Sequence, residues 1–317
     1  MDTSHPSNLL TSSNLLDLRH TRPSGTVQFA HFGELVPRAH YHYTDCHRVT
    51  GSPGHRQSVK NQHAIGQGLF MIITIRSIIF NAFMFAYALL SVIVMTLSLP
   101  FPRPVLMSIV RAWPRVSAPL FHLFVGIRHE FRGIQNIPDG PFILASKHQS
   151  AWDTMAFYWV LNDPAFILKK ELLALPLYGW CARKARVIGV DRSGGAKALR
   201  SMVEQAKGYI DQGRPIIIFP EGTRTVPGQR IPYHPGIAAL YTRLNVPVVP
   251  VALNSGLFWG RRSFVKYPGC IAIEFLPPIP PGMERRAFMT ELTERIETAN
   301  DHLNAEAMRH YPYLPRL

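Results

Sequence analysis

The sequence predicts an α/β fold, in which a mostly parallel central sheet is flanked by helices and preceded by an N-terminal membrane-associated helical segment. Two observations carry this prediction. From residue 128 onward, short apolar runs of strand length alternate with stretches whose apolar residues recur at helical spacing. Before that point, residues 78–99 form an apolar run that is long enough to cross a bilayer.

The composition favours a membrane-associated protein. Apolar residues make up 47% of the 317 residues and charged residues 17%, so a sizeable core is available. The net charge of +14 suits nucleic acid, an anionic membrane face or phosphate-bearing substrates. The apolar run favours the membrane, and we find no aromatic-basic motif or helix-turn-helix spacing that would indicate a nucleic-acid partner. Three widely spaced cysteines predict neither a disulfide nor a zinc site.

The N-terminal part divides into a tail and a helical segment. Residues 1–67 are rich in Ser, Thr, Pro, Gly and His without sustained periodicity, which predicts a disordered tail. Alternatively, the start site is placed too early and Met71 is the natural first residue. Residues 68–127 are expected to form membrane-associated helices. Within them, residues 78–99 would reach about 33 Å as a spanning helix, with a buried core helix as the alternative, and Val105–Ile127 is typical of an interfacial helix.

Residues 128–310 are expected to form the globular domain, and residues 311–317 a C-terminal tail. Its predicted strands are Phe142–Ala145, Ala165–Leu168, Arg186–Val190, Pro215–Phe219, Val246–Leu253 and Cys270–Phe275. Predicted helices follow the first strand and cover Ala196–Gln212, Pro235–Leu244 and Phe288–Met308. Alternating strands and helices imply a mostly parallel sheet with helices on both sides.

The first candidate site is the pair His148 and Asp153, which lies on the turn between the strand Phe142–Ala145 and the helix after it. Histidine is the usual general base near neutral pH, and a carboxylate commonly holds its second ring nitrogen. The spacing of Ser150 and Asp153 is also that of a helix capping box. From this pair alone, both catalysis and capping stay open.

Further candidate residues follow other predicted strands. They are the polar residues Lys169, Arg192, Glu221, Thr223 and Arg224, together with Gly222, which permits a tight turn. Because ligands of open α/β sheets sit beyond the carboxyl ends of the strands, we expect these groups near His148. An arginine offers a planar fork that suits a phosphate, although each charge taken singly is equally typical of a solvated loop.

Taken together, these blocks resemble the signature of glycerolipid acyltransferases and, more narrowly, of bacterial 1-acylglycerol-3-phosphate acyltransferases. The blocks are H-x-x-x-x-D at 148–153, K-K-E-L at 169–172, G-V-D-R at 189–192, F-P-E-G-T-R at 219–224 and V-V-P-V at 248–251. The resemblance covers residues 70–310 in the family's order, and it identifies residues 128–310 as the acyltransferase domain. Residues 1–67 are the main departure from the family pattern.

The resemblance implies transfer of a fatty acyl group from acyl-CoA or acyl-carrier protein to the free hydroxyl of lysophosphatidate, which gives phosphatidate. His148 would act as the base and Asp153 would hold its ring. Lys169, Arg192 and Arg224 would bind the acceptor phosphate. The other residues of the last block, Glu221, Gly222 and Thr223, would complete the acceptor site. The resemblance implies no metal, and no cofactor besides the acyl donor as co-substrate.

The resemblance also implies an enzyme of the cytoplasmic (inner) membrane, with membrane phospholipids as partners and an active site that faces the cytosol. Arginines on both sides of residues 78–99 leave the positive-inside rule indecisive. Two alternatives stay open. The protein acylates glycerol 3-phosphate or another lysolipid, or it is a non-catalytic membrane lipid-binding protein.

Overall fold

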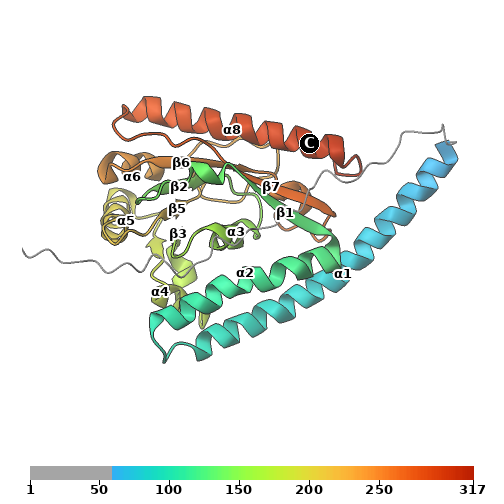
Figure 1. Ribbon diagram of the computed structural model, residues 1–317, viewed down its shortest axis with the longest axis horizontal. Coiled ribbons are helices and arrows are strands. Elements are labelled where there is room, and N and C mark those ends of the chain that lie inside the picture. Colours follow the sequence, from blue (N-terminus) through green and yellow to red (C-terminus); the bar gives the residue numbers. More distant parts are fainter. Residues whose placement is uncertain (1–58) are drawn as a thin grey trace, which may run out of the picture. The chain divides into compact units, whose positions relative to one another are not determined.

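The computed structural model describes residues 59–317, with side chains from Gly68 onward, so most of the predicted tail lies outside the described residues. A seven-stranded sheet has the strand order β1-β7-β6-β2-β5-β3-β4 (Figure 1). The strands are β1 (Ile127–Arg132), β2 (Ile143–Ser146), β3 (Ala165–Lys169), β4 (Ile188–Val190), β5 (Ile216–Ile218), β6 (Val248–Leu253) and β7 (Gly269–Phe275).

Helices precede, connect and follow these strands. They are α1 (Val59–Leu97), α2 (Arg103–Val125), α3 (Asp153–Val160), α4 (Tyr178–Lys184), α5 (Gly195–Ile210), α6 (Gly236–Leu244), α7 (Ser255–Phe258) and α8 (Arg285–His310). Two 3-10 helices, η1 (Ile134–Asn136) and η2 (Lys170–Ala174), follow β1 and β3.

The sheet is mostly parallel, as predicted. The central strand β2 pairs in parallel with β5 and β6, and β3 pairs in parallel with β5 and β4. The strands β1 and β7 also run parallel to each other, but β7 is antiparallel to β6. The carboxyl ends of β2, β3, β4, β5 and β6 therefore meet at one edge of the sheet, and those of β1 and β7 point to the opposite edge.

All six predicted strands are present, with ends shifted by at most two residues, but β1 was not predicted. Its sequence, IRHEFR, is too polar for an apolar run, and its first residue, Ile127, was expected to end the preceding interfacial helix. The strand lies at the edge of the sheet and pairs with β7 alone. Edge strands commonly carry charged side chains, which is why their hydrophobic signal is weak.

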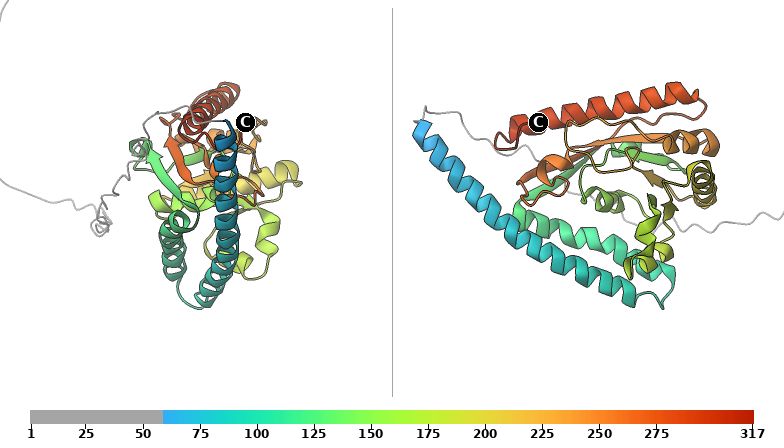
Figure 2. Two further views of the ribbon diagram at one scale, coloured as in Figure 1. Left: turned by 90° about the vertical axis from the view of Figure 1, so that its right-hand side faces the viewer. Right: turned by 180° about the vertical axis from the view of Figure 1, so that it is seen from behind.

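Alternate side chains of the central strands pack into two separate cores. Leu144 and Ile217 belong to the core that includes residues of α2 and α3. Their neighbours Ile143 and Ile216 belong to the core formed with α5, α6 and α8. Helices thus cover both faces of the sheet, which Figures 1 and 2 show as layers above and below the strands. Burial on both faces explains why these strands are continuous apolar runs.

The helices α1 and α2 lie side by side and antiparallel (Figures 1 and 2). Residues 78–97 of the predicted span belong to α1, and residues 98–99 form a turn. The helix begins at Val59, before the predicted boundary at residue 68. Gly68–Leu97 is long and apolar enough to cross a membrane, and 11% of its most apolar window is buried. A core helix of a soluble domain would be mostly buried. The exposure of this helix therefore favours a membrane-associated helix over the buried-core alternative. Arg76 joins the two helices, because its Nε donates to the carbonyl of Phe124 at 2.7 Å.

Residues 311–317, the expected tail, form no helix or strand but pack against the domain. Leu314 is buried, and the hydroxyl of Tyr313 donates to the carbonyl of Pro268 at 2.8 Å. Cys181 is a free, buried thiol. Cys46 lies outside the described residues, so the absence of a disulfide stays a prediction.

Gly133 provides a test of the turn that ends β1. Its φ is +69°, and a Cβ added there would lie 2.1 Å from the carbonyl oxygen of Phe275. We expect Gly133→Ala to lower the free energy of unfolding by at least about 1–3 kcal/mol, because a side chain adds strain and a clash. Chemical denaturation measures this loss. Gly140→Ala is the matched control, since a Cβ at Gly140 meets nothing within 4 Å. Equal losses of stability in the two variants would contradict the close packing of Gly133 against Phe275.

Candidate active site

The candidate site lies at the edge of the sheet where β2, β5 and β6 end. His148 follows β2, and Asp153 is the first residue of α3. The segment 219–224 follows β5, and Ser255 begins α7 directly beyond β6. Because β2 pairs in parallel with both β5 and β6, the three segments leave the sheet next to one another.

His148 and Asp153 form a direct pair. The Nδ1 atom of His148 lies 2.9 Å from Oδ2 of Asp153. The side chain of Asp153 is fully buried, while that of His148 is 15% exposed. With Nδ1 donating to the carboxylate, the second nitrogen, Nε2, is the acceptor. The imidazole thus has one end fixed within the protein and a ring that solvent or a substrate can reach.

The carboxylate of Asp153 is held by four donors. Besides His148, the backbone amides of Gln149 and Ser150 donate to Oδ2 at 2.7 and 2.8 Å. The hydroxyl of Ser255 donates to Oδ1 at 2.6 Å. The hydroxyl of Ser150 accepts from the amide of Trp152 at 3.1 Å and not from that of Asp153, and the N-cap residue of α3, Trp152, makes no side-chain cap, so the predicted capping box is not formed. The Asp153 carboxylate binds backbone amides and the His148 ring at the same time.

The loop after β5 holds His148 from its other side. The His148 ring stacks on Phe219, with ring centroids 3.9 Å apart and an interplanar angle of 18°. The His148 amide donates to Oε2 of Glu221 at 2.8 Å, and its carbonyl accepts from the amide of Thr225, also at 2.8 Å. The position of the imidazole is therefore fixed both at the backbone and at the ring.

Beneath His148 lies a buried ionic cluster of Lys147, Glu221 and Glu297. The Nζ of Lys147, whose side chain has no exposed surface, lies 2.9 Å from Glu221 and 2.7 Å from Glu297. The hydroxyl of Tyr233 donates to the Glu297 carboxylate at 2.9 Å. Burial raises the pKa of the Glu221 carboxyl, and the Lys147 cation opposes this rise. The cluster links the end of β2, the end of β5 and α8.

The predicted phosphate-binding side chains occupy different surroundings. Lys169 is half exposed and pairs with Glu171 at 3.0 Å. Arg192 lies close to Gly222, since a Cβ added to this glycine would be 3.8 Å from the guanidinium carbon. The φ of Gly222 is +66°, which satisfies the prediction of a tight turn. Arg224 is partly buried and, like Glu221, follows β5. Its backbone carbonyl accepts a hydrogen bond from the guanidinium of Arg261 at 2.8 Å.

Several residues that shape the site were not predicted. Ser255 and Glu297 stand far along the chain from Asp153 and Lys147, and no local spacing connects them. His234 lies against the tight turn, because a Cβ on Gly222 would be 2.9 Å from its Nε2. Glu221 was expected at the acceptor, yet its side chain is buried and contacts Lys147, His148 and Thr225.

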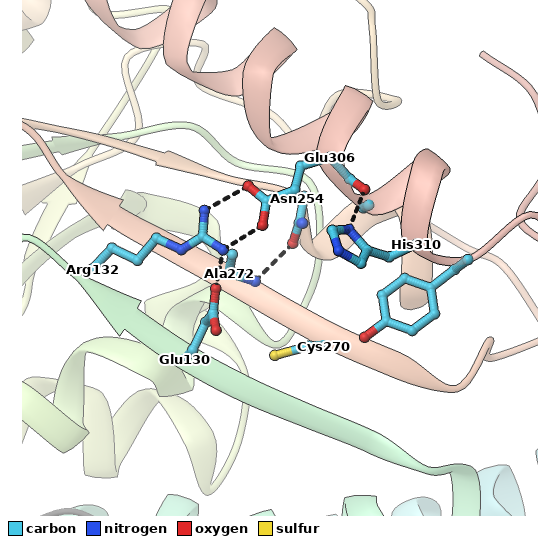
Figure 3. A pocket seen from close by; sticks show the side chains of 9 residues that line it. Glu130, Arg132, Asn254, Cys270, Ala272, Glu306 and His310 are labelled. Carbon is cyan, nitrogen blue, oxygen red and sulfur yellow. Dashed lines mark hydrogen bonds and ion pairs between the residues drawn. The ribbon is translucent and has the colours of Figure 1, made fainter. Parts of the chain in front are cut away.

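A separate pocket lies between β1, β7 and α8 (Figure 3). Its charged side chains bind one another: Arg132 donates to the two carboxylate oxygens of Glu306 at 2.7 and 2.6 Å and pairs with Glu130. None of the predicted site residues lines it. Within the described part of the chain, no group of three or more His, Cys, Asp or Glu side chains is arranged to hold a metal ion.

Comparison with known proteins gives a consistent result. A sequence model of the acyltransferase family matches residues 128–254. The 1-acyl-sn-glycerol-3-phosphate acyltransferase of Pseudomonas aeruginosa is 35% identical over 189 residues, which cover 60% of this chain and 74% of that protein. The human 1-acyl-sn-glycerol-3-phosphate acyltransferase alpha is 33% identical over 158 residues, or 49% of this chain and 56% of that protein.

A solved structure has the same fold. It is the crystal structure of the 1-acyl-sn-glycerophosphate acyltransferase from Thermotoga maritima, which aligns with a TM-score of 0.56. The alignment covers 76% of this chain and 98% of the other, at 21% sequence identity. At this identity the likeness concerns the fold, including the mostly parallel sheet.

Lys147→Met tests the buried cluster. Removing the cation leaves two carboxylates buried without their partner, so we expect a loss of about 3–5 kcal/mol in the free energy of unfolding. Glu297→Gln should cost less, because Lys147 keeps Glu221 as its counter-ion. Urea denaturation gives both values. The control is Lys169→Met, which breaks an exposed ion pair and should cost less than about 1 kcal/mol. A cost for Lys147→Met no greater than the control's would contradict the cluster's structural role.

Proposed function

Because the chain belongs to the acyltransferase family that includes the 1-acyl-sn-glycerol-3-phosphate acyltransferases, we propose that it transfers a fatty acyl group to the free hydroxyl of 1-acylglycerol 3-phosphate. The product is phosphatidate, and the acyl donor is a thioester of coenzyme A or of acyl-carrier protein. The observation that carries the proposal is the His148–Asp153 pair, which lies within the residues that match the family.

The pair performs general base catalysis. Nε2 of His148 takes the proton of the acceptor hydroxyl while the hydroxyl oxygen attacks the thioester carbonyl. A carbon–oxygen bond forms, and collapse of the tetrahedral intermediate breaks the carbon–sulfur bond. The imidazolium then returns the proton to the leaving thiolate. Asp153, fixed by Gln149, Ser150 and Ser255, keeps the proton on Nδ1 and stabilises the imidazolium.

We assign the acceptor phosphate to the cations around the tight turn at Gly222. Arg192 lies beside this turn, Arg224 follows it, and Lys169 leaves the sheet at the same edge. Guanidinium groups bind phosphate oxygens through two parallel hydrogen bonds. The contacts of Glu221 favour a different role from the one its sequence block implied. It holds the amide of His148 and the cation of Lys147, so we assign it to positioning the base.

The membrane helix explains how the protein meets its substrate. Both the acceptor and the product carry acyl chains, and exposing each methylene to water costs about 0.8 kcal/mol. An enzyme that is held at the bilayer by α1 takes the acceptor from the interface and avoids this cost. We place the site on the cytosolic face of the inner membrane, where acyl thioesters are made.

His148→Ala tests the chemistry. We expect kcat/KM for acyl transfer to fall by about 10²–10⁴-fold, because the base is lost, while the protein stays folded. The assay follows phosphatidate formation from 1-acylglycerol 3-phosphate with each donor in turn. His302→Ala is the control, since this histidine is exposed on α8. Full activity in His148→Ala would leave the protein without its proposed base.

Arg224→Met tests the acceptor site. Loss of a charged donor to the phosphate should raise KM for the acceptor about tenfold or more and leave KM for the acyl donor nearly unchanged. Monoacylglycerol, which lacks the phosphate, should be acylated equally by both enzymes. Arg309→Met removes an exposed arginine from α8 and serves as the control. Equal changes with and without the phosphate would refute the assignment, and a panel that includes glycerol 3-phosphate identifies the preferred acceptor.

A further inference from the structure

An exposed apolar strip follows β3 and takes no part in the proposed chemistry. The strip consists of Leu172, Leu175, Tyr178 and Trp180, from η2, α4 and the turn between them. These four side chains are 39%, 48%, 41% and 50% exposed. Large apolar side chains that are exposed together commonly mark contacts with a membrane or a protein.

The backbone beneath the strip is held in one conformation. A Cβ on Gly179 would lie 2.1 Å from the carbonyl oxygen of Leu173, so α4 packs directly against η2. Leu177 has a φ of +61°, and the amide of Tyr178 donates to the carbonyl of Pro176 at 2.6 Å. A non-glycine residue in this conformation is strained, and such strain persists where the surroundings fix it. The backbone that carries the four side chains is therefore well defined, and their exposure belongs to the folded structure.

The strip lies next to the end of α1. Figures 1 and 2 show α4 beside the turn between α1 and α2. The Nζ of Lys184, in α4, donates to the carbonyls of Leu99 and Phe101 in that turn. Leu97 and Phe101 are themselves 68% and 58% exposed. Exposed apolar side chains therefore occur on α1, on the turn and on α4, and these three elements are neighbours.

The charges around the strip suit an anionic lipid surface. Residues 169–186 contain five Lys or Arg and one carboxylate, Glu171, which pairs with Lys169. Tyr and Trp are enriched where a membrane meets water, because their rings are apolar and one end is polar. Basic residues beside such rings add attraction to anionic phospholipids.

We propose that the strip is a second membrane contact, which enters the headgroup layer of the leaflet that the end of α1 meets. It holds the carboxyl edge of the sheet, and with it His148, against the lipid surface. The occupant is an anionic phospholipid bilayer. The role in catalysis rests on the proposed function, because only a lipid acceptor requires the site to face the bilayer.

The full chain, reconstituted in phosphatidylethanolamine–phosphatidylglycerol vesicles with brominated acyl chains, provides the test. The contribution of Trp180 to fluorescence is the difference between the natural protein and Trp180→Phe. We expect the brominated chains to quench this contribution. A second measurement compares acylation of long-chain 1-acylglycerol 3-phosphate in vesicles with that of a short-chain, water-soluble analogue.

We expect the double variant Leu175→Ser/Trp180→Ser to lose about tenfold in activity on the vesicle-bound acceptor, because apolar surface that would enter the lipid is removed. Its activity on the soluble analogue should stay within about twofold. Ile134→Ser is the matched control. Ile134 is 40% exposed but lies on η1, at the opposite edge of the sheet, so neither activity should change.

Unquenched Trp180 fluorescence overturns the proposal, as does an equal loss of both activities, which would indicate a structural role. A different result would show that a second copy of the chain covers the strip. In that case Trp180 of the natural protein is not quenched, and the natural protein is a dimer while the double variant is a monomer. If the natural protein acylates neither acceptor, the proposed function is wrong, whatever the quenching shows. The quenching measurement does not depend on that result.

Discussion

The site depends on the buried interaction of Lys147 with Glu221 and Glu297. A cation and two carboxylates that are removed from water stabilise one another only when they stay in contact. Each of the three belongs to a different element, the end of β2, the end of β5 and α8. The cluster therefore does more than contribute to stability. It fixes the distance between two loops whose separation decides where His148 lies.

His148 is adjacent to this cluster in the chain and is positioned by it. Glu221 binds Lys147 with one carboxylate oxygen and the amide of His148 with the other. Phe219, on the same loop, supports the imidazole ring, and Ser255 holds the far oxygen of Asp153. These contacts fix both the backbone and the ring of His148. In the proposed reaction, such preorganisation favours catalysis, because little reorganisation is left for the moment of reaction.

The proposed acceptor site lies at the same edge of the sheet. Arg192 is close to Gly222, Lys169 ends β3, and α1 adds a long apolar surface to the domain. In the proposed function, these cations bind the acceptor phosphate, and α1 holds the enzyme at the bilayer that contains the acyl chain. The parallel sheet is the reason that these cations share an edge, since it directs every strand end with a functional loop toward one side.

The sequence by itself determined the alternation of strands and helices, the apolar helix, and the spacing that pairs His148 with Asp153. These are local properties: a period of apolar residues and a five-residue turn. Only the tertiary structure placed Ser255 on Asp153 and Glu297 on Lys147, hid Glu221 from the surface and added the polar edge strand β1. The physical reason is the order of strands in the sheet, which differs from their order in the chain, so contacts between distant segments leave no mark in local spacing.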